Sequence, residues 1–330
     1  MTPVLLSLLL LVFIAISLRL MQVTRRLRAS EERWKFALEG AGDGVWDWDV
    51  LSDTVVFSSR YKEMAGYSDA DIAADEQAWR ERIHPEDRAQ VEEDIRAYLD
   101  GRSTRYYNEH RVICRDGTVK WVLARGMIVS RSANGQARRM IGTHADITRR
   151  REMETRMHHL AHFDPLTDLP NRALIHDRLQ QAVAKARRDK SQLALMFLDL
   201  DKFKPVNDHL GHEVGDLLLK QVAGRLLDSV RASDTVARIG GDEFVVLLPV
   251  ILQQQDAVVV AEKILQALRH PFEVAGHQLT ISVSIGIAAY PDHGDNEKLL
   301  LINADIAMYH AKRAGRNGCC FFVRGMQSEQ

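Results

Sequence analysis

Seven residues, Arg238 to Phe244, constrain the fold of this chain more than any other stretch. They include a Gly-Gly pair at 240–241, and apolar runs flank them at 235–237 and 245–248. Such a pair between two apolar runs predicts a tight β-hairpin, because glycine accepts the positive φ that primed turns require. Asp242 and Glu243 follow directly, so two carboxylates are expected at the hairpin tip, where they are free to hold a metal ion beside a phosphate.

The composition is that of a globular protein with room for two domains. The chain has 330 residues, of which 46% are hydrophobic and 27% charged. A formal net charge of −1 gives no support for general nucleic-acid binding, so no nucleic-acid partner is expected. The three cysteines, Cys114, Cys319 and Cys320, make neither a disulfide framework nor a zinc site, and they fit a reducing compartment.

The N-terminus has the character of a membrane segment. Residues 4–18 are uncharged and almost wholly aliphatic, and extension to Val23 gives roughly the 20 residues that a membrane helix needs. Three arginines follow at 25, 26 and 28, so the positive-inside rule places the downstream chain in the cytoplasm. We therefore expect an anchor helix over 1–23, a basic juxtamembrane linker over 24–32 and single-pass insertion in a bacterial inner membrane. A cleaved signal peptide is the alternative, but the run has no basic n-region.

Residues 33–148 predict a small α+β domain in which short helices pack on a five-stranded antiparallel sheet. The expected helices are 33–38, 59–64 and 87–99, and the expected strands are 45–50, 54–57, 106–114, 119–129 and 138–144. The motifs at 84–87, 115–121 and 142–148 resemble a PAS domain with its C-terminal PAC motif. The ligand of this sensor-like domain stays open. His84 and His110 are possible haem ligands, but lone histidines are more often structural.

Residues 149–161 predict a charged signalling helix that joins the two domains. Met153, Met157 and Leu160 follow the spacing of a short coiled-coil seam. His158 and His162 have the spacing of metal ligands on a helix, but no third ligand completes a set, which favours a solvated or packing role.

Residues 162–324 predict a palm-like α+β domain with an antiparallel central sheet. A continuous apolar strand at 193–200 ends at Asp199 and Asp201, which point to one face. In a palm-like sheet the end of this strand lies beside the hairpin, so Asp199 is expected to meet Asp242 and Glu243. Carboxylates that converge repel each other, which favours a divalent cation such as Mg²⁺.

Beyond the hairpin, the motifs at 197–208, 210–216 and 304–317 are similar to those of the GGDEF family of diguanylate cyclases. This resemblance implies a homodimeric nucleotidyltransferase that condenses two GTP into cyclic di-GMP, with two Mg²⁺ or Mn²⁺ ions per GTP site. It implies metal ligation by Asp199, Asp242 and the Leu200 carbonyl, with Asp242 and Glu243 catalytic. The implied substrate-binding residues are Asn207 and Asp216 for guanine, Lys204, Lys312 and Arg316 for the phosphates, and His212.

The resemblance also implies feedback by the product. Arg231 and Asp234 have the spacing and the offset from the Gly-Gly pair of the family's inhibitory site for cyclic di-GMP. An arginine suits a phosphate or the Hoogsteen edge of guanine, and a carboxylate accepts hydrogen bonds from guanine N–H groups. The alternative is a catalytically degenerate module that only binds cyclic di-GMP, and the intact Gly-Gly-Asp-Glu-Phe sequence argues against it.

Overall fold

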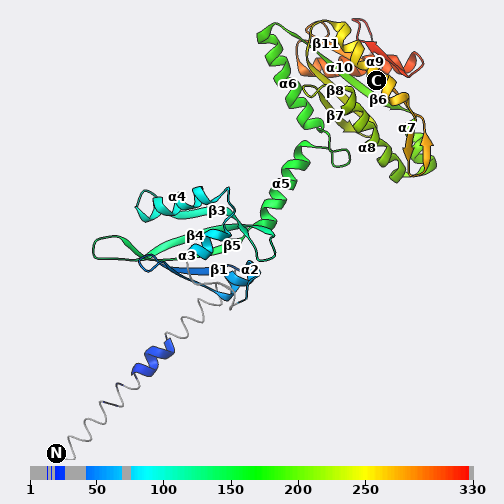
Figure 1. Cartoon of the computed structure of the whole chain (residues 1–330). Helices are drawn as coiled ribbons and strands as arrows, with labels where there is room; N and C mark the ends of the chain where they lie inside the picture. The colour runs from blue at the N-terminus through cyan, green and yellow to red at the C-terminus, as the bar shows by residue number, and fades with distance from the viewer. Residues whose placement is uncertain (1–12, 14–15, 17–18, 27–41, 69–75, 327–330) are drawn as a thin grey trace, which may run out of the picture. The chain divides into compact units, whose positions relative to one another are not determined.

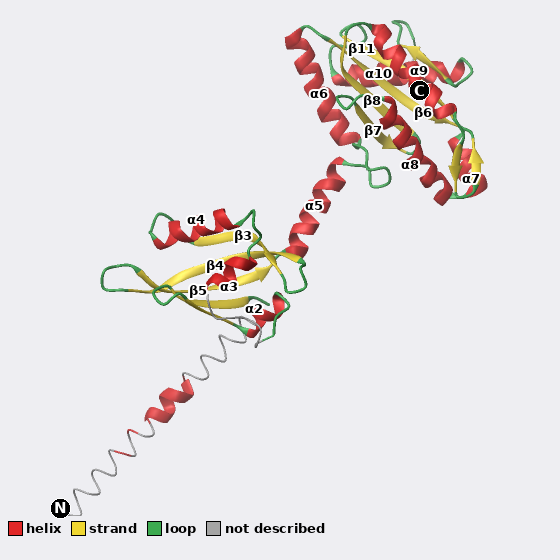
Figure 2. Ribbon diagram, viewed as in Figure 1, coloured by secondary structure: helices red, strands yellow, loops and turns green. Residues whose placement is uncertain are grey.

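The computed structural model describes residues 13, 16, 19–26, 42–68 and 76–326. The chain divides into two compact units, Met1–Glu154 and Thr155–Gln330 (Figure 1). The helix predicted at 33–38 lies outside the described residues. Each unit has a five-stranded sheet and its own hydrophobic core, as Figure 2 shows by secondary structure.

The first unit is a five-stranded sheet of order β2-β1-β5-β4-β3, in which every neighbouring pair is antiparallel. The strands are β1 (Gly44–Asp49), β2 (Thr54–Phe57), β3 (Tyr106–Ile113), β4 (Val119–Arg131) and β5 (Ala137–Asp146). Side chains alternate in burial along β3, so one face of this strand forms the core and the other meets solvent. The predicted PAS-like sheet is confirmed.

Short helices accompany this sheet. They are α2 (Ser59–Met64), α3 (Glu76–Arg82) and α4 (Arg88–Leu99). Ser58 caps α2 by accepting a hydrogen bond from the backbone N–H of Tyr61. Helix α3 was not predicted, and it contributes Trp79 to the core of the unit.

The second unit has a sheet of order β12-β11-β6-β8-β7, which matches the predicted palm-like layout. Its strands are β6 (Gln192–Asp201), β7 (Thr235–Gly240), β8 (Glu243–Ile251), β11 (Ser282–Tyr290) and β12 (Gly318–Phe321). The hydrophobic strand β6 lies in the middle of the sheet, between β8 and β11. The helices are α6 (Arg172–Asp189), α7 (Phe203–Leu210), α8 (His212–Ser229), α9 (Gln254–Arg269) and α10 (Glu297–Arg313).

Three details of this unit lie outside the sequence-based description. Residues 203–229 form two helices, α7 and α8, because Gly211 adopts a φ of 86° between them. A separate two-stranded antiparallel sheet, β9 (Phe272–Val274) with β10 (His277–Leu279), precedes β11. Strand β12 was not predicted, and it pairs with β11 in parallel.

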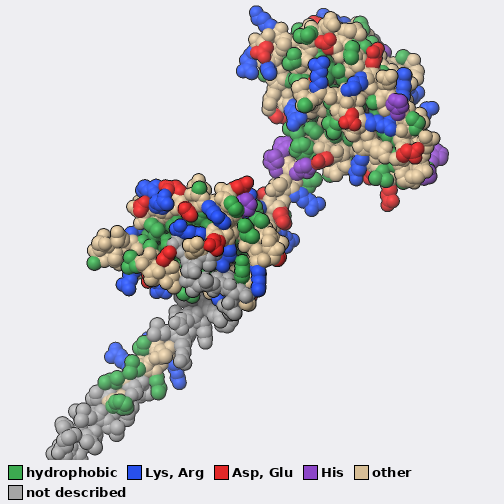
Figure 3. All heavy atoms as spheres, in the orientation of Figure 1, with side chains coloured by type: hydrophobic (Ala, Val, Ile, Leu, Met, Phe, Trp, Pro, Cys, Tyr) green, Lys and Arg blue, Asp and Glu red, His purple; other side chains and the backbone are tan. Residues whose placement is uncertain are grey.

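Helix α5 (Thr148–His162) occupies the predicted signalling segment. None of its residues is buried, and Met153, Met157 and Leu160 are 50%, 67% and 47% exposed. Histidine side chains gather on the surface near its C-terminal end (Figure 3), where the rings of His158 and His162 lie 4.7 Å apart. In the described part of the chain, α5 therefore presents an apolar stripe with no covering element.

The predicted inner-membrane localisation is contradicted. Across the ranges that the structure describes, no helix combines the length and the apolar character needed to cross a bilayer. The helical segment at 19–26 carries three arginines, at 19, 25 and 26, which lower its hydropathy. The rest of the predicted anchor, residues 1–12, 14–15 and 17–18, lies outside the described residues.

Candidate active site

Three predicted carboxylates meet at one end of the central strands of the second unit. Asp199 near the end of β6 is the register partner of Glu243, the first residue of β8. The backbone N–H of Leu200 donates to the carbonyl oxygen of Asp242 at 3.3 Å. The register therefore places Asp199, the Leu200 backbone and the Asp242–Glu243 pair side by side, as the topology argument predicted.

The hairpin tip is tied to the segment that enters the unit. The guanidinium of Arg238 donates to the carbonyl of Gly241 at 2.8 and 3.0 Å, and to Asp164 Oδ1 at 2.8 Å. Both side chains of the ion pair are largely buried, at 10% and 15% exposure. This ion pair was not predicted, although Arg238 belongs to the seven-residue motif. The pair holds the Gly-Gly turn against the loop before α6.

The electrostatics of the acidic cluster favour a bound cation. Burial raises the pKa of Asp199, and the nearby Asp242 and Asp201 raise it further, whereas Lys312 lowers it. Burial likewise raises the pKa of Glu243, with contributions from Asp199, Asp305 and Asp242. A divalent cation would stabilise these carboxylates in their charged form.

The donor set fits a hard divalent cation that keeps most of its shell for water and phosphate. Carboxylate oxygens of Asp199 and Asp242 with the Leu200 carbonyl are ligands of the type that Mg²⁺ prefers. Within the described residues no group of three or more His, Cys, Asp or Glu side chains is arranged as a complete metal site. Lys312 Nζ lies 2.7 Å from Asp199 Oδ1 and provides the positive charge in this arrangement.

Asp201 has a different position from Asp199, although both point to one face of β6. Its side chain is 2% exposed and accepts hydrogen bonds from the hydroxyls of Ser282 and Ser284 at 2.6 and 2.8 Å. It also accepts from the backbone N–H of Asn317 at 3.0 Å. Asp201 therefore joins β6 to β11 and to the turn after α10.

The predicted phosphate-binding residues come from separate elements. Lys204 is exposed on α7, and His212 is the exposed first residue of α8. Lys312 lies in the last turn of α10, but Arg316 follows the end of that helix in a left-handed conformation, with φ of 64°. Lys312 therefore projects from the helix and Arg316 from the turn that follows it. Arg316 Nε lies 3.9 Å from Asp201 Oδ1, which places the arginine at the same end of β6 as the acids.

The predicted guanine-binding residues lie on either side of the α7–α8 break. Asn207 belongs to α7 and the exposed Asp216 to α8. The side-chain oxygen of Asn207 is buried and has no hydrogen-bond partner among the described residues. A Cβ added to Gly215 would lie 1.9 Å from this oxygen, so only glycine leaves the amide in place. An orphaned acceptor beside an exposed carboxylate is an arrangement that a base with N–H groups would satisfy.

The predicted inhibitory residues lie in a separate cavity of about 460 Å³. The carboxylate of Asp234 accepts from the backbone N–H of Arg231 at 2.9 Å, and the Asp234 N–H donates to the Arg231 carbonyl at 2.9 Å. These bonds form a compact turn before β7 and leave the Arg231 side chain exposed. Asp256, Leu252 and Val259 form further parts of the same cavity wall.

Comparison with protein-family models assigns both units. Residues 161–318 match the model described as diguanylate cyclase, GGDEF domain, and residues 54–144 match the PAS fold model. The molecule is thus a two-domain protein in which a PAS domain precedes a GGDEF domain. The chain belongs to the GGDEF family, as the sequence motifs predicted.

Several curated proteins are similar to this chain. The bifunctional diguanylate cyclase/cyclic di-GMP phosphodiesterase MucR of Pseudomonas aeruginosa is 52% identical over 51% of this chain and 24% of its own length. Diguanylate cyclase TpbB of the same organism is 46% identical over 48% of this chain and 37% of its own length. An uncharacterized protein of Sinorhizobium fredii, y4lL, is 32% identical over 88% of this chain and 35% of its own length. The chain thus spans about a quarter to two fifths of these relatives.

Two solved structures are also similar. The GGDEF domain of TpbB is 43% identical, and the match covers 48% of this chain and 98% of the TpbB chain, with a TM-score of 0.47. The coiled coil and GGDEF domain of DgcB from Caulobacter crescentus, in complex with c-di-GMP, is 28% identical. The match covers 53% of this chain and 93% of the DgcB chain, with a TM-score of 0.49.

Proposed function

We propose that the protein is a diguanylate cyclase that condenses two GTP into cyclic di-GMP and two pyrophosphates. The observation that carries the proposal is the register of β6 and β8, which aligns Asp199 with Glu243 and brings the Asp242 backbone to Leu200. This register supports the proposal because the Leu200 backbone and the carboxylate-bearing residues 199, 242 and 243 are neighbours in a domain that also carries the predicted base-binding and phosphate-binding residues.

In this mechanism the 3′-hydroxyl oxygen of each GTP attacks the α-phosphorus of the other, and pyrophosphate leaves with its former bridging oxygen. Asp242 accepts the proton of the attacking hydroxyl. Lys204, Lys312 and Arg316 hold the phosphates, and Lys312 exchanges its contact with Asp199 for one with the nucleotide. Two Mg²⁺ or Mn²⁺ ions per GTP site, when bound, supply the positive charge that stabilises the attacking and leaving oxygens.

The substrate is GTP because the base site suits guanine. Asp216 accepts hydrogen bonds from guanine N1–H and the exocyclic amine, and the amide of Asn207 completes the edge. Adenine offers no donor at N1, so ATP would leave Asp216 without its bond, and a site built for hydrogen bonds rejects such an analogue strongly.

Two copies of the chain must act together, because each GGDEF domain holds one GTP and the reaction joins two. The exposed stripe of Met153, Met157 and Leu160 on α5 has the spacing of a short coiled-coil seam and supports a homodimer that brings two half-sites together. In this proposal the PAS domain controls that encounter. Product bound at Arg231 and Asp234 inhibits it.

The test is incubation of the purified full chain with GTP and Mg²⁺, followed by nucleotide chromatography. We expect cyclic di-GMP with GTP and no cyclic product with ATP. Binding of cyclic di-GMP without turnover of GTP would instead establish the degenerate binding module.

A further inference from the structure

A groove of about 930 Å³ lies beside the acidic cluster of the GGDEF unit, and the mechanism above does not use it. Its lining is largely apolar and includes Phe163, Ile175, Phe197 and Ile239. Glu243, one of the predicted catalytic residues, is part of the same lining. The groove therefore adjoins the place where the proposed reaction occurs.

The same groove reaches the end of α5. Leu160, the last member of the exposed stripe on this helix, is part of the lining. Asn171 holds that end of α5 against α6, because its side-chain amide donates to the carbonyl oxygens of Leu160 and Ala161 at 3.4 and 3.0 Å. Its side-chain oxygen accepts from two backbone N–H groups in the first turn of α6, at 2.9 and 3.1 Å. Arg172, the next residue, is therefore held in a fixed place relative to the α5 stripe.

Arg172, the first residue of α6, is an uncommitted cation in this groove. It is exposed, lines the groove and makes no hydrogen bond or ion pair with any residue that the structure describes. Arg238, which lines the same groove, is by contrast only 10% exposed and is bound to Asp164. Arg172 lies within electrostatic reach of Glu243 but does not pair with it. A guanidinium with all its donors available, beside a reaction of phosphates, is suited to bind two phosphate oxygens at once.

The groove lies on a different side of the central sheet from the predicted base site. Helices α7 and α8, which carry the predicted guanine-binding residues, pack with the core cluster on one face of the sheet. Ile175, Phe197 and Ile239 of the groove belong to the cluster on the other face. In the proposed reaction one GTP occupies the base site at α7 and α8, and the second GTP is held by another copy. That second GTP is therefore expected to reach the acidic cluster from the groove side.

We propose that Arg172 binds the phosphates of the GTP held by a second copy of the chain, so that each reaction site is completed by an arginine from the other copy. This inference rests on the proposed function and adds a residue to it. Two copies joined along the α5 stripe bring Leu160 of each next to the other copy, and the groove that contains Leu160 also contains Arg172. The guanidinium holds oxygens of the α-phosphate while the 3′-hydroxyl oxygen forms its bond to phosphorus and the bond to pyrophosphate breaks. It offsets the negative charge that develops there.

The test separates the binding of one nucleotide from the encounter of two. Its probe is 3′-deoxy-GTP with Mg²⁺, which carries every phosphate of GTP but lacks the attacking hydroxyl and so is not condensed. In the full-length wild type we expect the probe to strengthen dimerisation at least about tenfold, measured by analytical ultracentrifugation. In Arg172→Ala this gain should be lost, while affinity for the probe at protein concentrations too low for dimers stays within about threefold of wild type. The initial rate of cyclic di-GMP formation from GTP should fall at least about tenfold.

Arg188→Ala is the matched control, because Arg188 lies in the last turn of α6, is exposed and does not line the groove. It should behave as wild type in all three measurements, and Arg172→Lys, which keeps the charge, should recover part of the gain. The inference is overturned if the probe does not strengthen the wild-type dimer or if Arg172→Ala keeps the gain. It is also overturned if Arg172→Ala loses affinity for the probe at low protein concentration, since Arg172 would then serve its own nucleotide. A wild type that dimerises with the probe but forms no cyclic di-GMP from GTP would contradict the proposed function instead.

Discussion

The two units both build on five-stranded sheets, but they place their polar groups differently. In the GGDEF unit Asp199 and Glu243 lie at the ends of paired strands, where sequence neighbours and register bring carboxylates together at an accessible edge. In the PAS unit Tyr106, His110 and His144 are buried inside the core, and several of their polar atoms have no partner among the described residues. The first arrangement suits reaction of a large anionic substrate, whereas the second keeps titratable groups uncharged inside the fold.

The largest effect is expected when one carboxylate is removed from the acidic cluster of the GGDEF unit. Asp242→Asn removes the proposed proton acceptor and a metal ligand at nearly constant volume, so initial rates of cyclic di-GMP formation should fall at least about a hundredfold. Asp189→Asn, at the exposed end of α6, is the control and should keep the wild-type rate. Comparable rates in the two variants would refute the proposed role of Asp242.

The buried histidines of the PAS unit should make that unit sensitive to acid. Burial lowers the pKa of His110 from 6.5 to about 4, so the unfolded chain binds a proton before the folded one does. Stability is therefore full above pH 6.5 and is lost as pH falls toward 4. At pH 5 the loss from His110 is about 2 kcal/mol relative to pH 8.

Urea unfolding followed by tryptophan fluorescence measures this effect selectively, because all five tryptophans lie between residues 34 and 121. His110→Leu should reduce the difference between pH 8 and pH 5 by about 2 kcal/mol and leave the contribution of His144. An unchanged difference in the variant would mean that His110 is not held neutral in the folded state.

The proposed base site of the GGDEF unit can be tested with a matched pair of glycines on α8. Gly215→Ala places a methyl group against the Asn207 amide, so kcat/KM for GTP should fall about tenfold or more. Gly224→Ala is the control, because a Cβ at that position meets nothing within 4 Å. If Gly215→Ala uses GTP as well as the control does, Asn207 does not contact the base.

A smaller effect is expected at the proposed inhibitory site. Arg231→Ala should weaken inhibition by cyclic di-GMP about tenfold, roughly 1.4 kcal/mol, while initial rates stay within a few-fold of wild type. Arg231 precedes β7, whereas the carboxylates belong to β6, to the Gly-Gly turn and to β8, so its removal leaves the acidic cluster intact. Progress curves with added cyclic di-GMP measure the change. Equal inhibition of wild type and Arg231→Ala would show that Arg231 does not bind the product.

The sequence predicted most of the GGDEF unit, because local patterns set its elements. The Gly-Gly pair between two apolar runs predicted the β7–β8 hairpin, and the palm-like topology then predicted that Asp199 of β6 lies beside it. The position of Arg316 could not be predicted in this way, since its left-handed turn is held by a long-range hydrogen bond from the backbone N–H of Asn317 to Asp201 of β6. The same holds for the role of Asp201, whose partners are about 80 and 116 residues away in sequence.

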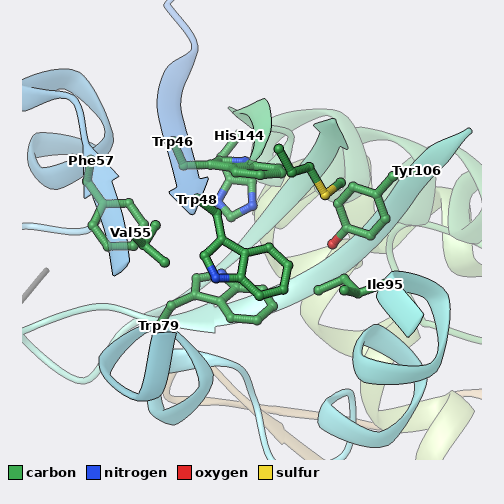
Figure 4. A pocket seen from close by; sticks show the side chains of 9 residues that line it. Trp46, Trp48, Val55, Phe57, Trp79, Ile95, Tyr106 and His144 are labelled. Atoms are coloured by element: carbon green, nitrogen blue, oxygen red, sulfur yellow. The ribbon is translucent and has the colours of Figure 1, made fainter. Parts of the chain in front are cut away.

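The small cavity of about 30 Å³ inside the core of the PAS unit (Figure 4) was not predictable either. Tyr106, Trp46 and His144 come from three strands, and nothing in their spacing shows that their side chains line one space. The sequence drew attention to His84 and His110 as possible ligands. In the structure His84 is partly exposed beside Glu86, and the cavity is lined by His144 instead. Only side-chain packing reveals which buried histidine lies beside open space.

We propose above all that the acidic cluster at the paired ends of β6 and β8 holds divalent cations together with GTP. The most direct measurement is Mn²⁺ binding to the full chain, by electron paramagnetic resonance, with a non-hydrolysable GTP analogue present. We expect Asp199→Asn to weaken Mn²⁺ binding at least about tenfold, while Asp189→Asn binds as wild type does. Equal affinity in Asp199→Asn and wild type would contradict the claim.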